Sequence, residues 1–540
     1  MFTVNGHVLE SPDLKYRGDV TIATKAKGSW NMRPIQPKRP DLVPKFREAN
    51  KLRQWAWLVI SKNGNVTNVH RERLRSFMQA MNNAGIDTTA PQGDSVPDTN
   101  TAKSLNSCFK AWSGKGLQLL LIMLPKKDTL LYNQIKQLGD KRYGIQTVCI
   151  GGPDRFFNPD FKPWSYFANV ALKVNLKLMG TNHVLNSPDV RGQGPGSVSG
   201  SGALGIISEG KTMVLGIDVT HPSPGSAENA PSVAAMVAST DKVLAQWPAA
   251  LRIQKIDTKT AETQKQKIGT NKATDAGNKM KGARQEMVFG VKGMFVDLLD
   301  IWKSRNNSYP ENILIYRDGV SESQYAQVLR DELQPLRDQC AHTYPRDMTS
   351  RDLPRFTMIV VGKRHHTRFF PILDPKNPRK AVKNSTADDH GNPEPGLVVD
   401  RAITSSHNFD FFLQSHAAIK GTARPAHYIV LADEIFTRIY KPHGPRSLPG
   451  QCKSIADVIQ TLTHNMCYLY GRATRAVSYC PAAFYADRAC ERARRYLGGH
   501  FDAVVDEGSM MGGVGRPDAV DAVDADVAVH ERLRGTMFYI

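Results

Sequence analysis

Short, continuous apolar runs dominate this sequence and constrain its fold class. Three of them, WAWLVIS (55–61), LQLLLIML (117–124) and IQTVCI (145–150), are separated by amphipathic segments, one of which spans about 130–139. Continuous apolar runs of this length are typical of strands that are buried on both faces. Helices between such strands imply parallel pairing. The sequence therefore predicts an α/β domain with helices on both faces of a parallel sheet.

A second α/β unit is predicted after the Gly- and Ser-rich segment 191–204. The expected strands are 211–219, 232–240, 312–318, 357–363 and 428–433, and the expected helices are 284–302, 453–469 and 481–497. Because 540 residues are too many for one ordinary core, we expect a linker at 1–52, a first domain at 53–185 and a second domain at 186–540. The Pro-, Lys- and Arg-rich linker is expected to run extended, outside any core.

The charge balance points to a polyanionic partner. Lys and Arg number 71 against 51 Asp and Glu, a formal excess of +20. This excess favours nucleic acid, although a basic enzyme indifferent to nucleic acid is also consistent with it. Seven cysteines with no CxxC pair argue against a disulfide framework and against zinc. The sequence has no apolar run long enough to span a membrane, and cytosol or nucleus is the expected location.

Four acidic residues form a candidate catalytic set. Asp218 and Asp318 each end a predicted apolar strand, Asp487 lies in the helix predicted at 481–497, and Glu286 lies near the start of another helix. An isolated buried carboxylate costs several kcal/mol unless it is paired or binds a cation. If these acids converge, they suit two Mg²⁺ ions that cleave a phosphodiester. Taken singly, a strand-terminal Asp is more often a turn or helix cap than a metal ligand.

A second set of residues is suited to a phosphate. Tyr132 and Lys136 stand four residues apart, as do Lys173 and Lys177, so each pair shares a helix face, and Gln146 begins a strand between the two helices. Lysines and a tyrosine can bind a phosphate and stack a base. A solvated helix face with lysine stems lying over apolar residues is the alternative.

One helix could serve both sites. Arg492 follows Asp487 by five residues, which places the two side chains about 140° apart around the helix axis. Further basic residues follow predicted strands or lie in loops, and they are candidates for contact with a nucleic-acid backbone or with surface acids. These residues are Lys363, Arg364, His416 and Arg424.

Several longer motifs resemble the Argonaute family, specifically the second linker, MID and PIWI regions of its eukaryotic members. The motifs occur in family order along essentially the whole chain. They are GSWNMR (28–33), GIDVTHPSPG (216–225), ARQE (283–286), IYRDGVSESQ (315–324), KRHHTRFF (363–370), SHAAIKGTARPAHY (415–428), FYADRACERAR (484–494) and the final TMFYI.

The resemblance implies a Rossmann-like MID domain and an RNase H-like PIWI domain. It implies that Asp218, Asp318 and Asp487 hold Mg²⁺ or Mn²⁺, with two ions expected when nucleic acid is loaded, and that Glu286 completes the catalytic tetrad. Many eukaryotic relatives carry His at the third of these positions, and Asp487 is a chemically better Mg²⁺ ligand. The chain is expected to lack the N-terminal and PAZ domains of the family.

The resemblance also assigns a pocket for the 5′-phosphate of a guide RNA to Tyr132, Lys136, Gln146, Lys173, Lys177 and Arg492. Residues 126–129 correspond to the loop that reads the first base. The expected partners are a small guide RNA with a 5′-phosphate, a target RNA and silencing proteins. The expected activity is guided cleavage of RNA. A guide-binding scaffold that does not cut, or another RNase H-like nuclease of the integrase type, remain the alternatives. The resemblance gives no role to 252–283 or 499–530.

Overall fold

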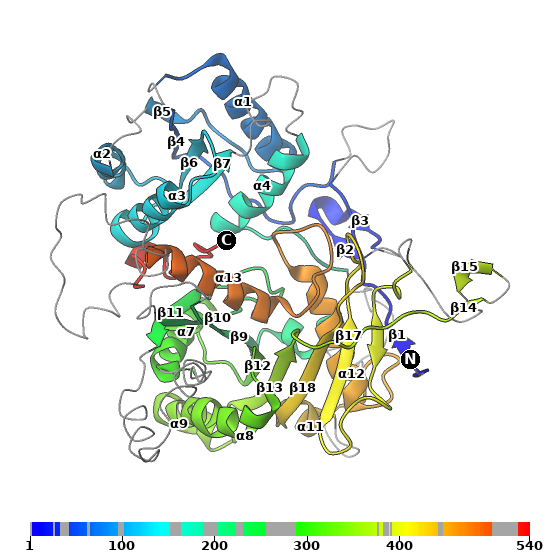
Figure 1. Ribbon diagram of the computed structural model, residues 1–540. Coiled ribbons are helices and arrows are strands. Elements are labelled where there is room, and N and C mark those ends of the chain that lie inside the picture. The colour runs from blue at the N-terminus through cyan, green and yellow to red at the C-terminus, as the bar shows by residue number, and fades with distance from the viewer. Residues whose placement is uncertain are drawn as a thin grey trace, which may run out of the picture.

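A computed structural model describes most of the chain. The described residues are 3–24, 28–32, 43–61, 65–95, 102–151, 164–186, 203–222, 231–254, 288, 290–374, 377–381, 388, 391–440, 446–498 and 527–540. They form two sheet-based units with one long helix between them (Figure 1).

The first unit is a four-stranded parallel sheet in the order β5-β4-β6-β7. Its elements are β4 (Trp55–Val59), α1 (Asn68–Asn83), β5 (Gln92–Ser95), α2 (Ala102–Ser113), β6 (Leu119–Leu124), α3 (Thr129–Lys136), β7 (Thr147–Gly151) and α4 (Trp164–Lys177). Beyond α3 the chain continues as a π-helical segment, Gln137–Tyr143. All of the side chains on β4 and β6 are buried. The predicted parallel α/β domain is therefore confirmed.

The second unit is built on a nine-stranded mixed sheet in the order β1-β16-β17-β18-β13-β12-β9-β10-β11. Its strands are β1 (His7–Val8), β9 (Thr212–Thr220), β10 (Ser232–Ala238), β11 (Ala249–Gln254), β12 (Asn312–Asp318), β13 (Arg355–Gly362), β16 (Leu397–Val399), β17 (Phe409–Gln414) and β18 (Ala426–Asp433). The strands β9, β12 and β13 are parallel to one another, and the remaining neighbours pair antiparallel.

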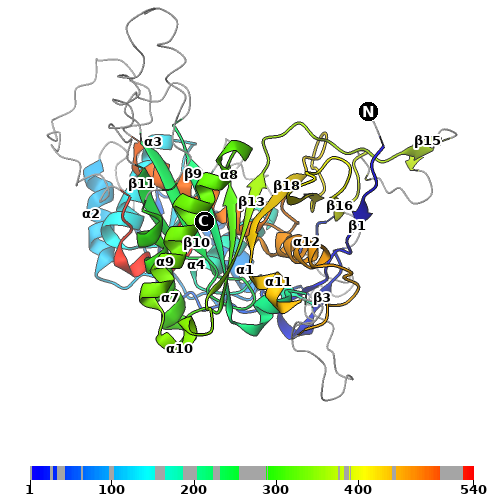
Figure 2. The same ribbon diagram turned by 90° about the horizontal axis from the view of Figure 1, so that it is seen from below.

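Helices cover both faces of this sheet (Figure 2). The helices are α7 (Val291–Asn306), α8 (Tyr325–Val328), α9 (Gln334–Thr343), α10 (Arg346–Thr349), α11 (Ile435–Ile439), α12 (Ile455–Met466) and α13 (Pro481–Tyr496). A small hairpin, β14 (Leu373–Asp374) and β15 (Asn377–Ala381), extends from this unit. The predicted strands and the helices at 453–469 and 481–497 are present to within a few residues. The helix predicted at 284–302 is observed as α7, from Val291 to Asn306.

Alternation along the central strands determines which side chains meet which helices. On β9, Met213, Leu215 and Ile217 share a core with α7, whereas Val214 lies in the core that includes α13. Successive side chains on a strand point to opposite faces, so Asp218 shares the face of Val214. The same parity on β12 places Asp318 on the face of Leu314, again toward α13. The sheet thus directs both aspartates to the same side.

The prediction that residues 1–52 lie outside any core is wrong for the described part. Tyr16 and Phe46 are fully buried, and Trp30 donates a hydrogen bond from Nε1 to the Tyr16 hydroxyl at 2.7 Å. β1 pairs with β16 at the edge of the large sheet, and β2 (Leu14–Lys15) forms a small sheet with β3 (Thr21–Ile22) and β8 (Val184–Leu185). Aromatic residues scattered through a basic, Pro-rich segment supply enough apolar area to tie it to both units.

No helix within the described ranges is both long and apolar enough to cross a membrane.

Candidate functional site

Helix α13 connects two polar sites, and a glycine fixes its position. A Cβ atom at Gly216 on β9 would overlap the carbonyl oxygen of Ala482 in the first turn of α13. Only glycine allows this close approach of helix and strand. The helix then runs across β9 and β10 and also contacts α3 of the first unit. Figure 1 shows α13 lying between the two units.

The first site lies where β9 and β12 end. The two strands pair in parallel up to Ile217 opposite Arg317, so Asp218 and Asp318 are the next residues on adjacent strands. Adjacent strands lie about 4.8 Å apart, which makes the two carboxylates neighbours. Asp487, in the second turn of α13, lies above the same face. The structure therefore brings together three acids that are far apart in the sequence.

The charges of these acids act on one another. Burial, followed by the charges of Asp318 and Asp487, raises the pKa of Asp218 to about 7. Burial is also the main cause of the raised pKa values of Asp318 and Asp487. Such shifts mark a site where negative charge is costly and a nearby cation is stabilising.

Carboxylate oxygens are the ligands that Mg²⁺ and Mn²⁺ prefer, so the donor chemistry fits a divalent ion. The geometry fits less well. Within the described residues, no three His, Cys, Asp or Glu side chains are grouped closely enough to ligate one ion. A cationic side chain, Lys363, stands beside Asp318 instead, with Nζ 3.9 Å from Oδ2. Glu286 lies outside the described residues.

The second site is a cavity of about 390 Å³ between the first unit and α13. Its basic lining residues are Lys127, Lys136, Lys173, Arg472, Arg488, Arg492 and Arg495, and its acidic ones are Asp128 and Glu491. Tyr132 also lines it, with its ring centroid 5.2 Å from Lys136 Nζ. A concave site with this excess of cations is suited to a compact anion such as a phosphate.

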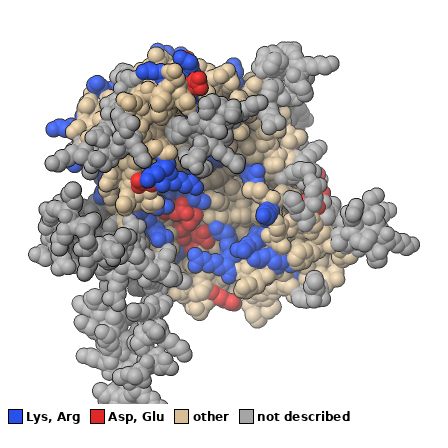
Figure 3. All heavy atoms as spheres, turned by 45° about the horizontal axis from the view of Figure 1, so that its top comes forward, with Lys and Arg blue, Asp and Glu red and all other residues tan. Residues whose placement is uncertain are grey.

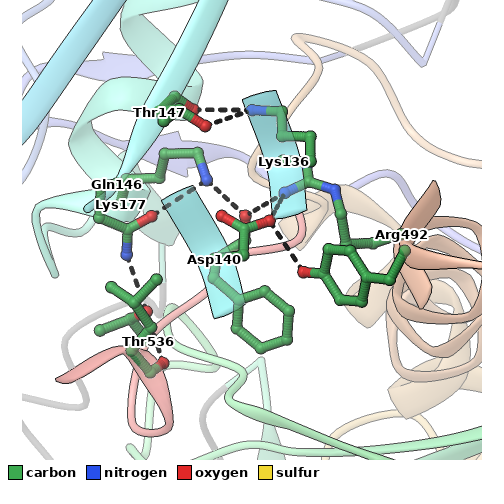
Figure 4. A network of polar contacts seen from close by, with 10 residues as sticks. Lys136, Asp140, Gln146, Thr147, Lys177, Arg492 and Thr536 are labelled. Atoms are coloured by element: carbon green, nitrogen blue, oxygen red, sulfur yellow. Dashed lines mark hydrogen bonds and ion pairs between the residues drawn. The ribbon is translucent and has the colours of Figure 1, made fainter. Parts of the chain in front are cut away.

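A buried polar network forms the wall of this cavity (Figure 4). Lys136 donates from Nζ to the backbone oxygen and the hydroxyl of Thr147, at 3.1 and 2.6 Å. Arg492 Nη1 donates to Asp140 Oδ2 at 2.6 Å, and the Tyr496 hydroxyl donates to the same oxygen at 2.8 Å. This network joins the π-helical segment of the first unit to α13.

Two predicted phosphate ligands lie behind the wall rather than in the cavity lining. Lys177 Nζ donates to Gln146 Oε1 at 3.2 Å and to the Phe538 carbonyl at 2.6 Å, and Gln146 Nε2 donates to the Thr536 hydroxyl at 2.8 Å (Figure 4). Burial lowers the pKa of Lys177 well below its usual value. In this arrangement the two side chains fasten the segment 536–538, and their direct contact with a phosphate remains a prediction.

Of the predicted ligands, Tyr132, Lys136, Lys173 and Arg492 line the cavity. Burial, followed by the charges of Arg472 and Lys136, lowers the pKa of Lys173 to about 8. Because neighbouring cations destabilise the charged form of Lys173, a bound anion would stabilise that form. The five-residue offset between Asp487 and Arg492 directs these two side chains of α13 to different sites. Asp487 lies at the carboxylate site and Arg492 at the cavity.

Sequence reasoning missed several members of this site. Asp140 is the buried partner of Arg492, and Arg472, Arg495 and Tyr539 line the cavity. Asp140 stands four residues after Lys136, one helical turn on from a residue already selected, so that spacing was an available signal. The arginines belong to segments whose approach depends on tertiary packing, which no local pattern reveals.

The four candidates for backbone contact are placed differently from one another. Arg364 and Arg424 are exposed. His416 is partly buried, and burial lowers its pKa to about 4, so its ring is neutral at pH 7. Lys363 lies at the carboxylate site. Figure 3 shows acidic side chains in a hollow flanked by Lys and Arg. A neutral His416 can still donate a hydrogen bond to a phosphate, but it brings no charge.

Comparisons with known proteins agree with this architecture. The family model described as Piwi domain matches residues 119–498. The rice protein argonaute MEL1 is 33% identical over 100% of this chain and 46% of its own length, and argonaute 10 of Arabidopsis thaliana is 33% identical over 99% and 48%. The chain thus spans about half the length of the curated relatives that it matches.

Solved structures match the whole fold. The MID-PIWI domains of the N. crassa AGO protein QDE-2 are 28% identical, with a TM-score of 0.56 over 92% of this chain and 100% of that one. The C-terminal lobe of a budding yeast Argonaute gives a TM-score of 0.69 at 23% identity, over 99% of this chain and 95% of that one. The unit with the four-stranded sheet is accordingly Rossmann-like and MID-like, and the unit with the nine-stranded sheet is RNase H-like. The chain belongs to the Argonaute family and matches the C-terminal, Piwi-domain-containing part of its members.

Proposed function

We propose that this chain binds the 5′-phosphate of a small guide RNA in the basic cavity and supports cleavage of a complementary target RNA at the carboxylate site. The observation that carries the first part is the concentration of lysine and arginine side chains around one cavity. The observation that carries the second is the register that makes Asp218 and Asp318 neighbours, with Asp487 facing them. The family membership agrees with both parts.

In the cavity, Lys136, Lys173 and Arg492 would bind the terminal phosphate. Lys136 is oriented by its two hydrogen bonds to Thr147, which leave one N–H for a ligand. Arg492 is oriented by Asp140, and Tyr132 offers a ring on which the first base can stack. Because Lys136 and Arg492 are already held by these hydrogen bonds, little further entropy of these two side chains is lost when the phosphate binds.

At the carboxylate site, Asp218, Asp318 and Asp487 would hold Mg²⁺ or Mn²⁺ next to the scissile phosphate. Bound there, divalent ions supply an activated water and neutralise charge on the leaving oxygen. The carboxylates would hold such ions at the strand ends, and the burial of Asp218 and Asp318 limits access of other water. Glu286 would add a fourth carboxylate when nucleic acid is bound. The expected products carry a 3′-hydroxyl and a 5′-phosphate.

Single-turnover cleavage of a labelled target by the guide-loaded chain tests this proposal, with Asp218→Asn as the variant that keeps the shape of the side chain. The unsubstituted chain should cut at one position, and Asp218→Asn or EDTA should abolish cutting while guide binding persists. Equal cutting by both proteins would remove the carboxylate site from the mechanism. Guide binding without any cutting would favour the alternative, a scaffold that holds a guide and recruits silencing proteins.

A further inference from the structure

The ammonium group of Lys363 is held at the carboxylate site by two kinds of contact. Its Nζ lies 3.9 Å from Asp318 Oδ2 and 3.0 Å from the ring centroid of Tyr479. The Phe484 ring, 5.7 Å from Nζ, stacks on Tyr479 at a centroid distance of 4.7 Å. A cation over aromatic faces and beside a carboxylate is stabilised by both. Tyr479 and Phe484 thus form an aromatic shelf under the lysine.

Sheet register explains why Lys363 reaches this site. Val361 on β13 pairs with Asp318 on β12, and Lys363 follows two residues later. Lys363 directly follows the end of β13 at Gly362, and residues two apart in an extended segment point to the same face, so Lys363 projects toward α13 with Asp318 and Asp218. The shelf lies at the start of α13, the helix that carries Asp487, since Phe484 is in its first turn and Tyr479 precedes its N-cap residue, Cys480.

The shelf is a rigid part of the core rather than a surface feature. Tyr479 is only 2% exposed. The next residue, Cys480, donates its backbone N–H to the Tyr428 hydroxyl at 3.0 Å, which ties the start of α13 to β18. The lysine stem is flexible by comparison, and Lys363 is about one-third exposed. The lysine can therefore leave while the shelf stays in place.

We propose that Lys363 is an internal counter-ion of the carboxylate site, and that its ammonium group and a divalent cation compete for the same carboxylates. This inference rests on the proposed function, because it assumes that the acids bind Mg²⁺ or Mn²⁺. The acids are buried beside one another and need positive charge. Lys363 supplies one such charge in the metal-free protein. A divalent ion on the same carboxylates would lie within a few ångströms of the ammonium group, and like charges at that range repel strongly.

Competition and simple structural support lead to opposite expectations. If Lys363 only braced Asp318 in a metal-binding geometry, removing it would loosen the site and weaken metal binding. If Lys363 competes, removing its charge strengthens metal binding.

The test is a titration of the full chain with Mn²⁺ in the absence of RNA, followed by electron paramagnetic resonance of the free ion. Lys363→Met should lower the half-saturating Mn²⁺ concentration on the order of tenfold. Lys363→Arg, which keeps the charge, should stay close to the unsubstituted chain. Tyr479→Leu, which removes the shelf under the ammonium, should lower the half-saturating concentration several-fold, whereas Tyr479→Phe should leave it unchanged.

The variant Asp318→Asn shows whether Mn²⁺ binds at the carboxylate site, and it separates the counter-ion proposal from the proposed metal mechanism. Mn²⁺ binding that Asp318→Asn abolishes, but that Lys363→Met leaves unchanged or weakens, would overturn the counter-ion while leaving the metal mechanism intact. If Asp318→Asn leaves Mn²⁺ binding unchanged both in the unsubstituted chain and in Lys363→Met, the counter-ion proposal and the proposed metal site are both overturned. The same holds if no variant binds Mn²⁺. If Lys363→Met melts well below the unsubstituted chain, Lys363→Gln removes the charge with a polar side chain and carries the same expectation.

Discussion

The ion pair between Arg492 and Asp140 ties the Rossmann-like unit to α13, and its loss should be costly. The Arg492 side chain is 5% exposed and that of Asp140 is 0% exposed. In Arg492→Met the carboxylate keeps only the Tyr496 hydroxyl as a polar partner on Oδ2, since Oδ1 accepts no hydrogen bond from the described residues. Removing one partner of a buried pair typically costs about 3–5 kcal/mol, because the other charge stays buried.

Urea denaturation, followed by tryptophan fluorescence and far-UV circular dichroism, measures this cost. The matched control is the double variant Asp140→Asn with Arg492→Met, which removes both charges and keeps both shapes. We expect the single variant to lose about 3–5 kcal/mol of unfolding free energy and the double variant to recover at least about half of that loss. A loss of less than about 1 kcal/mol in the single variant, or a double variant no more stable than the single one, would show that Arg492 does not neutralise a costly buried charge.

Three further predictions concern α13, the cavity and the outer basic residues. Gly216→Ala should lower the melting temperature by several degrees because the new methyl overlaps the Ala482 carbonyl, whereas Gly114→Ala, with open space around it, should be nearly neutral in the same thermal melt. Guide affinity, measured by binding titration from pH 7 to 9, should be constant up to about pH 8 and then fall by at most about tenfold per pH unit. The fall is expected because Lys173 loses its proton above its lowered pKa of about 8, and Lys173→Arg should abolish it. Arg424→Ala should reduce the salt slope of guide affinity by about one without changing the preference for a 5′-phosphate, and an unchanged slope would exclude Arg424 from backbone contact.

The strands could be predicted from sequence because burial on both faces leaves a local signature. Runs such as LLLIML on β6 and ILIY within β12 carry no charged residue. The linker prediction failed for a related reason. Tyr16 and Phe46 are isolated in a Pro- and Lys-rich context, so local composition hid the fact that each packs into a distant core.

The candidate site was predictable only in part. Spacing along one helix identified Lys136, Lys173 and the opposed faces of α13, since helical periodicity is local. Which residue neutralises a buried charge is a tertiary property. Asp140 as the partner of Arg492, and Lys363 as the partner of Asp318, follow from the approach of α3 to α13 and from the pairing of β12 with β13. The spacing of Asp140 after Lys136 is a local signal for that residue, but neither pairing is encoded in a local pattern.

Recognition of a terminal phosphate by the cavity is tested by equilibrium binding of two guide RNAs to the full chain, one with a 5′-phosphate and the same RNA with a 5′-hydroxyl. We expect a preference of at least about tenfold for the phosphorylated guide, because lysine and arginine side chains form charge-assisted hydrogen bonds with a phosphate. Lys173→Met should reduce that preference, and Lys303→Met, on the exposed end of α7, should preserve it. Equal affinity for the two guides would show that the cavity beside α13 does not recognise a terminal phosphate.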